Sequence, residues 1–423
     1  MNKSSYKLSP MQEGMLFDHL QSEQPGVDIE QMICSLNEAL NVLSLTQAWQ
    51  RMLERHSILR TSFGWQGLDE PMQTVHGQVQ LPLKQQDWRQ LSKSDREDKL
   101  QAYLKADRQQ GFDLTKPPLM RLALFQLEEA NYTLVWTFHH ILLDGRSLQL
   151  LLKEIFTFYE VFCRGEDLEL TQPLPYQDYI EWLQDQDFVK AETFWRKSLD
   201  GFTTPTPLVV DRVTNRKNHQ ESGHGEAECR LSETATEALK SLAKAHELTL
   251  NTLVQGAWAL LLSRYSGEED VVFGATRACR RSTLAGGESM IGIFINTLPI
   301  RVRVSPDRSM LAWLAELRQQ WISLRDYEHT PLVKVQQWSG ISGGISLFDS
   351  LLVFENYQMT SALQSIGDSW QCREFKLLEQ TSFPLTLAGY AGTELLLKIE
   401  YDSGKFDRPT ITRMLGHLQT LLE

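Results

Sequence analysis

The residues best suited to chemistry form one short run, His139-His140-Ile141-Leu142-Leu143-Asp144-Gly145. Acyl transfer to an amine needs a group that accepts the proton of the amine near neutral pH, and histidine is the side chain suited to that task. Asp144 can fix the loop by pairing with a cation, and Gly145 lets the backbone approach a substrate closely. The run therefore predicts acyl transfer to an amine, with an imidazole at the reacting centre.

Taken alone, the run is also compatible with one packed histidine and one surface histidine, because short motifs match by chance. A metal site is disfavoured by the same residues. Adjacent histidines on an extended strand point in different directions, and no third ligand lies at a usable spacing. The flanking elements and the other motifs of the chain must decide between these interpretations.

The run lies between elements that can hold it rigidly. Two β-rich stretches, residues 119–127 and 132–138, predict a hairpin that ends at His139. From Ser147, apolar residues recur at helical spacing as far as Phe162, which predicts an amphipathic helix. The N–H groups at the start of that helix are expected to point back toward the loop and to favour developing negative charge.

Both halves of the chain mix helices and strands, which favours two α/β lobes of similar size. Ser9 as a cap, Pro10 in the first turn and Gln12 in a capping box predict an N-terminal helix. The sequence also predicts helices over 44–55, 233–245, 252–265 and 409–422; strands over 58–63, 227–231, 271–276, 298–304, 347–354 and 394–401; a crossover over 173–182; and a surface loop or linker over 203–225.

Composition narrows the class of protein. The chain has 423 residues and a formal net charge of −12, which argues against nucleic acid as the main partner. The basic cluster Arg277, Arg280 and Arg281 is too short for a nucleic-acid footprint and indicates internal ion pairing or a partner contact. Five scattered cysteines without a CxxC pair fit free thiols in a reducing compartment. With no apolar leader and no run of 18 apolar residues, we expect a cytoplasmic protein.

Five other motifs accompany the HHxxxDG run, and the whole set resembles the condensation domains of nonribosomal peptide synthetases over nearly the full length of the chain. They are Leu8-Ser9-Pro10-Met11-Gln12-Glu13-Gly14-Met15-Leu16-Phe17; Arg55-His56-Ser57-Ile58-Leu59-Arg60-Thr61; Tyr176-Gln177-Asp178-Tyr179-Ile180-Glu181-Trp182; Ile291-Gly292-Ile293-Phe294-Ile295-Asn296-Thr297-Leu298-Pro299; and Phe348-Asp349-Ser350-Leu351-Leu352-Val353-Phe354-Glu355-Asn356-Tyr357. Each motif is modestly specific, but the set in this order is very specific.

The resemblance implies a fold and partners. The fold is a V-shaped pseudo-dimer of two chloramphenicol-acetyltransferase-like lobes around a central tunnel, with residues 1–175 carrying the HHxxxDG loop and residues 176–423 carrying the crossover and linker. Donor and acceptor peptidyl carrier proteins dock at opposite mouths and deliver thioesters on phosphopantetheine arms. No cofactor or metal is expected on the domain itself. The chain is expected to be a monomeric domain of a larger synthetase for a secondary metabolite, beside an adenylation domain.

The resemblance also implies roles for single residues: His140 and Gly145 are catalytic, His139, Asp144 and Arg280 are structural at the active site, and Ser147, Asn296, Ser350 and Asn356 line the substrate tunnel. His140 matches the catalytic histidine of the family, as a general base or as the group that positions the amine. Gly145 lies where the amine of the acceptor approaches. Asp144 is expected to pair with Arg280.

Three motifs depart from the form that is commonest in the family, and these departures indicate which class of donor substrate the chain accepts. Met11-Gln12-Glu13-Gly14 departs from the usual Gln-x-Arg, and Glu328-His329-Thr330-Pro331-Leu332 replaces the usual Gln-Asp-x-Pro-Phe. Both resemble subtypes that accept a D-configured donor, or starter domains that accept a fatty acyl group. Arg277-Ala278-Cys279-Arg280-Arg281 replaces the usual Ser-Gly-Arg-Pro. A dual epimerising subtype is rejected because His19 lacks a second histidine beside it, and a cyclising subtype because the His-His pair is intact.

Two rival functions stay open beside amide formation. One is a related enzyme, an ester-forming acyltransferase or an epimerase, although the DFGWG strand of plant-type acyltransferases is absent. The other is a non-catalytic module that only docks carrier proteins. The run Gly343-Gly344-Ile345-Ser346 looks like the attachment site of a carrier protein, but the strand expected beside it favours an element of the condensation domain.

Overall fold

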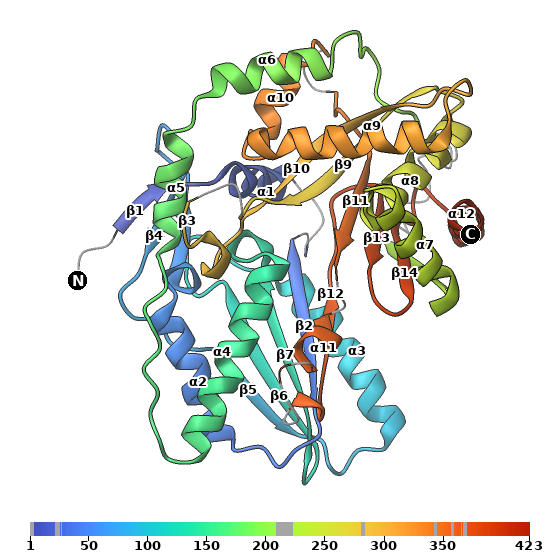
Figure 1. The fold of residues 1–423 in the computed structure, drawn as a ribbon. Coiled ribbons are helices and arrows are strands. Elements are labelled where there is room, and N and C mark those ends of the chain that lie inside the picture. The colour runs from blue at the N-terminus through green and yellow to red at the C-terminus, as the bar shows by residue number, and fades with distance from the viewer. Residues whose placement is uncertain are drawn as a thin grey trace. The chain divides into compact units, whose positions relative to one another are not determined.

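The computed structural model of the chain describes residues 4–21, 26, 28–208, 223–280, 284–341, 345–356, 359–364, 366 and 370–423. The chain forms two compact units, each with its own sheet (Figure 1). The first comprises Met1–Gln186, Thr283–Phe294 and Met359–Gln380, and the second comprises Asp187–Ser282, Ile295–Gln358 and Thr381–Glu423. The expected α/β class is confirmed, whereas the lobe boundary between residues 175 and 176 and the tunnel stay predictions.

The first unit contains a five-stranded sheet in the order β12-β2-β7-β6-β5 and a three-stranded sheet in the order β1-β4-β3. Its strands are β1 (Ser4–Lys7), β2 (Ile29–Leu36), β3 (Thr61–Gly64), β4 (Met72–Val75), β5 (Leu83–Asp87), β6 (Met120–Glu128), β7 (Asn131–His139) and β12 (Arg373–Leu378). Its helices are α1 (Pro10–Gln21), α2 (Val42–Arg55), α3 (Lys93–Gln110), α4 (Gly145–Cys163), α5 (Tyr176–Gln184) and α11 (Met359–Gln364), with short 3-10 turns η1 (Ser57–Arg60), η2 (His140–Leu142) and η3 (Gly287–Ser289).

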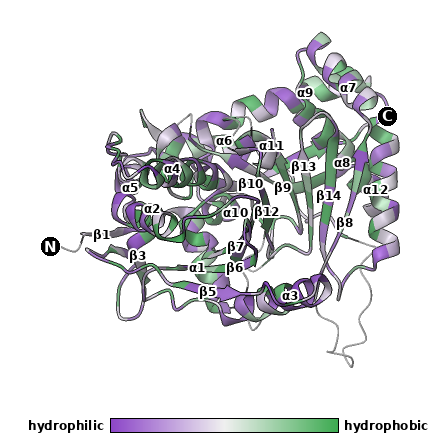
Figure 2. Cartoon of the chain, turned by 90° about the horizontal axis from the view of Figure 1, so that it is seen from below, coloured by the Kyte–Doolittle hydropathy of each residue, from purple (hydrophilic) through white to green (hydrophobic). Residues whose placement is uncertain are grey.

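The five-stranded sheet is covered on both faces. Helices α2 and α4 lie side by side on one face, and α3 lies across the other (Figures 1 and 2). Because side chains of a strand alternate between faces, consecutive residues of β7 pack against the helices on opposite faces of the sheet. Trp136 packs edge-on against Trp49 of α2, whereas Val135 belongs to the cluster with Leu104 of α3. The end of β7 is therefore held between two packed layers.

The second unit is built on a six-stranded mixed sheet in the order β10-β9-β11-β13-β14-β8. Its strands are β8 (His224–Leu231), β9 (Asp270–Ala278), β10 (Ile295–Arg303), β11 (Ser350–Glu355), β13 (Leu385–Tyr390) and β14 (Leu395–Asp402). Its helices are α6 (Phe188–Ser198), α7 (Glu233–Ala245), α8 (Leu250–Ser266), α9 (Met310–Ser323), α10 (Leu332–Trp338) and α12 (Arg408–Leu422), with the 3-10 turn η4 (Leu324–Tyr327). Helices α8 and α12 pack on this sheet, where Trp258 and Leu415 are buried with Phe273. In Figure 2, β13 and β14 are largely green, as expected for strands inside a core.

Most of the elements expected from the sequence are present, with two differences near the motifs. Residues 58–63 were expected to be a strand, but the chain first makes the 3-10 turn η1 and only then strand β3. The helix expected from Ser147 begins two residues earlier, at Gly145. Residues 209–222 of the expected linker and Gly343-Gly344 of the carrier-like run lie outside the described residues.

Candidate active site

Strand pairing fixes the backbone at the two histidines. In the antiparallel pair of β2 and β7, Ile29 lies opposite His139. The pairing continues for one more residue, since the backbone N–H of His140 donates to the carbonyl oxygen of Asp28 at 2.7 Å. The turn η2 then starts at His140, so the loop leaves the sheet at a defined point.

The imidazole of His140 is oriented by an acceptor on one side. Its Nδ1 lies 2.8 Å from the carbonyl oxygen of Leu143 and 3.3 Å from Oε1 of Glu30. A carbonyl oxygen can only accept, so Nδ1 carries the hydrogen in the neutral ring and Nε2 keeps its lone pair. The side chain is 21% exposed, whereas that of Glu30 is 5% exposed. His140 therefore presents a basic nitrogen on a partly open side chain.

His139 has a different environment. Its side chain is fully buried, and Nδ1 accepts a hydrogen bond from the backbone N–H of Ile141 at 3.2 Å. Burial holds the pKa of His139 well below its usual value, and the neighbouring imidazoles of His19 and His140 act in the same direction. The ring of His19 packs against it at 5.4 Å. A neutral, packed ring supports the structural role predicted for His139.

Asp144 joins the loop to a distant segment of the same unit. Its Oδ1 accepts from the backbone N–H of Ser147 at 2.8 Å, which makes it the N-cap of α4. Its Oδ2 accepts from the backbone N–H of Phe294 at 2.9 Å. The hydroxyl of Ser147 donates to the carbonyl oxygen of Gly292 at 2.6 Å and accepts from its N–H at 3.0 Å. The N–H of Ser147 thus points back to the loop, as expected, and its acceptor there is the Asp144 carboxylate.

The segment around Gly292 is held in turn by the crossover motif. The hydroxyl of Tyr176 donates to the carbonyl oxygen of Ile293 at 2.6 Å. A Cβ atom at Gly292 would lie only 2.1 Å from the ring of Tyr176, so a glycine is required for this close approach. Tyr179 packs on the ring of Phe294, with centroids 4.4 Å apart. Three motifs that are distant in sequence therefore meet at the start of α4.

The first two motifs also reach the HHxxxDG region. Gln12 forms the expected capping box, because its Oε1 accepts from the N–H of Ser9 at 2.9 Å and its own N–H donates to the Ser9 hydroxyl at 3.2 Å. The Nε2 of Gln12 then donates to the carbonyl oxygen of Ile141 at 3.1 Å. In the second motif, His56 lies 2.8 Å from a carboxylate oxygen of Glu154 on α4. Both contacts restrain the loop and the helix that follows it.

The remaining residues predicted for the site belong to the second unit. Arg280, Asn296 and Ser350 are buried, whereas Asn356 is exposed. The side-chain amide of Asn296 donates to the carbonyl oxygens of Glu328 and Thr330, at 2.9 and 2.8 Å. The pairing of Arg280 with Asp144 and the tunnel contacts of Ser147, Asn296, Ser350 and Asn356 stay predictions. Gly145, the first residue of α4, is half-buried, and its proposed contact with the amine is also a prediction.

The unusual Arg277 makes an internal ion pair. Its guanidinium donates to Oε2 of Glu328 at 2.8 Å and to the carbonyl oxygen of Trp321 at 3.0 Å, and it stacks over the Trp321 ring. Internal ion pairing was one of the two roles expected for this basic cluster. Glu328 is the first residue of the other unusual motif, so the two departures from the common family pattern form one ion pair, in which each charge neutralises the other. Arg281 lies outside the described residues.

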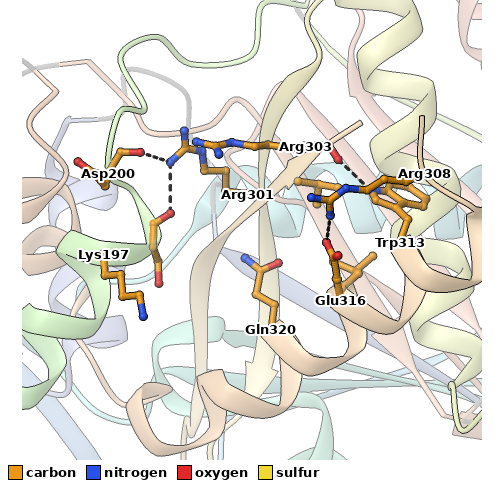
Figure 3. Close-up of a pocket in the computed structure, with 11 residues that line it drawn as sticks. Lys197, Asp200, Arg301, Arg303, Arg308, Trp313, Glu316 and Gln320 are labelled. Carbon is orange, nitrogen blue, oxygen red and sulfur yellow. Dashed lines mark hydrogen bonds and ion pairs between the residues drawn. The ribbon is translucent and has the colours of Figure 1, made fainter. Parts of the chain in front are cut away.

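A pocket of about 570 Å³ lies elsewhere in the second unit, between α6, β10 and α9 (Figure 3). Arg301 crosses one side of it and is held by Asp270 and by the carbonyl oxygen of Asp200. On the α9 side Arg308 pairs with Glu316. Its described lining includes neither a histidine nor a cysteine, so it does not offer the imidazole that acyl transfer to an amine calls for.

Among the residues that the structure describes, no three histidine, cysteine or acidic side chains are grouped in a way that could hold a metal ion. All five cysteines are free thiols. Within the same part of the chain, no helix has the length and apolar character needed to cross a membrane.

Sequence reasoning missed two residues beside His140. Asp28 and Glu30 precede and begin β2, a strand that the sequence analysis did not predict. Asp28 has a positive φ of 58° and is buried. Burial raises its pKa to about 6, although His140 opposes this rise. The apolar residues at 29, 32, 33 and 36 were the available signal for the strand, but only its pairing with β7 brings the carboxylates to the imidazole.

Comparison with solved structures places the fold. The X-domain from teicoplanin biosynthesis matches with a TM-score of 0.81 at 23% identity, covering 98% of this chain and 94% of that one. A mutant of the starter condensation domain of rhizomide synthetase matches with a TM-score of 0.81 at 18% identity, covering 99% of this chain and 95% of that one. At these identities the likeness concerns the fold alone.

Comparison of sequences gives the family. Subunits C and B of linear gramicidin synthase from Brevibacillus parabrevis are each 43% identical over 99% of this chain. Surfactin synthase subunit 3 from Bacillus subtilis is 31% identical over 99% of the chain. The chain spans only 5%, 8% and 32% of the lengths of these relatives, respectively. A family model described as the condensation domain matches residues 2–423, and the chain therefore belongs to the condensation-domain family of nonribosomal peptide synthetases.

Proposed function

We propose that the chain forms an amide bond between two carrier-bound substrates. The donor is an acyl or peptidyl thioester, the acceptor is an aminoacyl thioester, and both are carried on the phosphopantetheine arms of carrier proteins. The observation that carries the proposal is the imidazole of His140, whose Nδ1 faces the Leu143 carbonyl oxygen at 2.8 Å. This contact leaves Nε2 as the nitrogen that can receive a proton.

The chemistry balances with this single base. The amine nitrogen of the acceptor attacks the thioester carbonyl of the donor, a C–N bond forms and the C–S bond breaks. The amine gives up one proton, which Nε2 of His140 accepts, and the leaving thiolate takes up a proton in its place. We infer that Gly145, the first residue of α4, lets the amine of the acceptor approach the backbone closely, because it has no side chain.

For the donor we propose a D-configured peptidyl group or a fatty acyl starter. The support is the sequence around Gln12-Glu13 and at Glu328-His329, which departs from the form usual with L-configured donors. The departure in the first motif is Gly14 of α1, which stands where arginine is usual; Gln12, shared by both forms, is buried and donates to the Ile141 carbonyl oxygen of the HHxxxDG loop. Burial, together with the carboxylate of Glu70, raises the pKa of Glu13.

The test is intact-protein mass spectrometry of two loaded carrier proteins mixed with the chain. In separate reactions the donor carrier bears an L-aminoacyl, a D-aminoacyl or a fatty acyl group, and each reaction is repeated with the His140→Ala variant. We expect a condensed product on the acceptor carrier with the D-aminoacyl or fatty acyl donor, and its loss in the variant.

Other outcomes would redirect the proposal. A product only with the L-aminoacyl donor would overturn the donor assignment but keep the amide-forming enzyme. An ester product, or inversion of a carrier-bound residue without condensation, would favour the related acyltransferase or epimerase. Carrier binding without any reaction would favour a docking module.

A further inference from the structure

Two carboxylates that lie outside the HHxxxDG run flank the imidazole of His140. Both come from the beginning of β2, which lies beside β7 in the first unit (Figure 1). Asp28 lies opposite His140, because the N–H of His140 donates to its carbonyl oxygen. Side chains two residues apart on a strand share a face, so Glu30 lies diagonally across from His140. Its Oε1 is 3.3 Å from Nδ1 of His140.

We propose that Glu30 is a positioning residue that holds the imidazole of His140 with its hydrogen on Nδ1, so that Nε2 stays free to accept the proton of the amine. This inference rests on the proposed function, because it assigns a role within that reaction. The arrangement follows the general pattern in which a nucleophile or amine meets a base, and the base is oriented by a third group.

The geometry gives Glu30 a role that the Leu143 carbonyl cannot fill alone. Nδ1 faces two acceptors, the neutral carbonyl oxygen at 2.8 Å and the carboxylate oxygen at 3.3 Å. A ring with its hydrogen on Nε2 would turn the lone pair of Nδ1 toward both oxygens, which is electrostatically unfavourable. When Nε2 takes up a proton, the carboxylate also faces the positive ring. Glu30 is only 5% exposed, so solvent screens this interaction weakly.

Other charged or titratable groups near His140 do not replace Glu30. Asp28 is buried and interacts electrostatically with His140, but it binds His140 through its backbone carbonyl oxygen, whereas Glu30 brings a carboxylate oxygen to within 3.3 Å of Nδ1. His139 is neutral because its pKa is held well below the usual value, and His19 packs against His139. Asp18 of α1 acts on Asp28.

The test compares three substitutions of one residue. In Glu30→Gln the side-chain amide keeps the shape of glutamate but can donate to Nδ1, which permits the hydrogen to move to Nε2. The corresponding change in a serine protease triad produces the wrong tautomer and a large loss of kcat. We expect kcat of Glu30→Gln to fall about tenfold or more with the KM for the acceptor unchanged, and Glu30→Asp to restore most of the rate. Glu30→Ala should lose less than Glu30→Gln, because alanine cannot donate.

A second readout does not depend on turnover. With ¹⁵N-labelled histidine, the ring nitrogen shifts of His140 report which nitrogen carries the hydrogen. We expect the Nδ1–H form in the unaltered chain and in Glu30→Asp, and a larger share of the Nε2–H form in Glu30→Gln. An unchanged tautomer in Glu30→Gln, with kcat within about twofold, would overturn the assignment of Glu30. If the unaltered chain forms no product, the proposed function fails. The ring nitrogen shifts of His140 in the unaltered chain and in Glu30→Gln then still show whether Glu30 holds the hydrogen on Nδ1.

The control is Glu128→Gln in the same unit. Glu128 is the last residue of β6, with Oε1 3.8 Å from an Nη of Arg96, and its side chain is exposed. This change removes a carboxylate from the same sheet without touching His140 or the loop. It should leave the His140 tautomer and kcat unaltered, and an effect equal to that of Glu30→Gln would show a general loss of structure instead of positioning.

Discussion

Replacement of Asp144 by alanine should destabilise the first unit as well as slow the reaction. The carboxylate accepts from the backbone N–H of Ser147 and from that of Phe294, at 2.8 and 2.9 Å. Loss of an N-cap costs about 1 kcal/mol, and a buried N–H left without a partner costs about 1–3 kcal/mol. Phe294 is fully buried, so water cannot replace the lost acceptor. Together these losses lower the free energy of unfolding by about 2–4 kcal/mol.

Thermal unfolding followed by circular dichroism measures this loss. For a unit of roughly 200 residues, 1 kcal/mol corresponds to about 2–4 °C in Tm, so Asp144→Ala should lower Tm by roughly 4–16 °C. Asp144→Asn keeps one acceptor for the cap and should lose about half as much. Ser92→Ala removes an ordinary N-cap from α3, where the hydroxyl accepts from the N–H of Asp95. A Tm loss in Asp144→Ala no larger than that in Ser92→Ala would refute the reasoning.

Three further predictions follow from single contacts. Gly292→Ala should lower Tm by several degrees, because its Cβ would lie 2.1 Å from the Tyr176 ring. The double variant Gly292→Ala/Tyr176→Ala should lose less Tm than the sum of the two single variants, because the clash needs both residues. Asp28→Asn should raise Tm at pH 7.5 relative to the unaltered chain but not at pH 4. The pKa of Asp28 in the folded chain, about 6, lies above the ordinary aspartate pKa of 3.8, so the stability that this group contributes is lost as pH rises between the two values. Melting curves at both pH values check this, and an equal shift at each would contradict it. Arg373→Met should lower the free energy of unfolding by about 1.5–3 kcal/mol in urea titrations, because the partly exposed carboxylates of Glu38 and Glu160 lose their charged hydrogen bonds to this buried cation; a loss below about 0.5 kcal/mol would contradict this.

Local patterns predicted the elements that carry the histidines. The hairpin of β6 and β7 and the capping box at Gln12 were predicted because they depend on neighbouring residues. The start of α4 was placed two residues late because Asp144 was expected to pair with a cation and was not considered as a cap. Its polar contacts to Ser147 and Phe294 show that one carboxylate can serve both the helix and a distant segment.

Long-range pairing could not be predicted from local patterns. Strand β12 pairs with β2 although hundreds of residues separate them. No short turn joins the two strands, so local sequence does not determine which residues of β12 lie opposite which residues of β2. The carboxylate of Glu30 reaches His140 only through the pairing of β2 with β7. The family resemblance supplied the identity of His140, but family motifs do not contain Glu30, and the structure was needed to bring it to the imidazole.

The most direct test of the account is a single-turnover measurement with preloaded donor and acceptor carriers, comparing the unaltered chain with His140→Ala. A positioned general base contributes about 10²–10⁴-fold, so the rate of amide formation should fall by at least about 100-fold, while carrier binding and Tm stay unchanged. A rate within a few-fold of the unaltered chain would contradict the claim that His140 receives the proton of the amine.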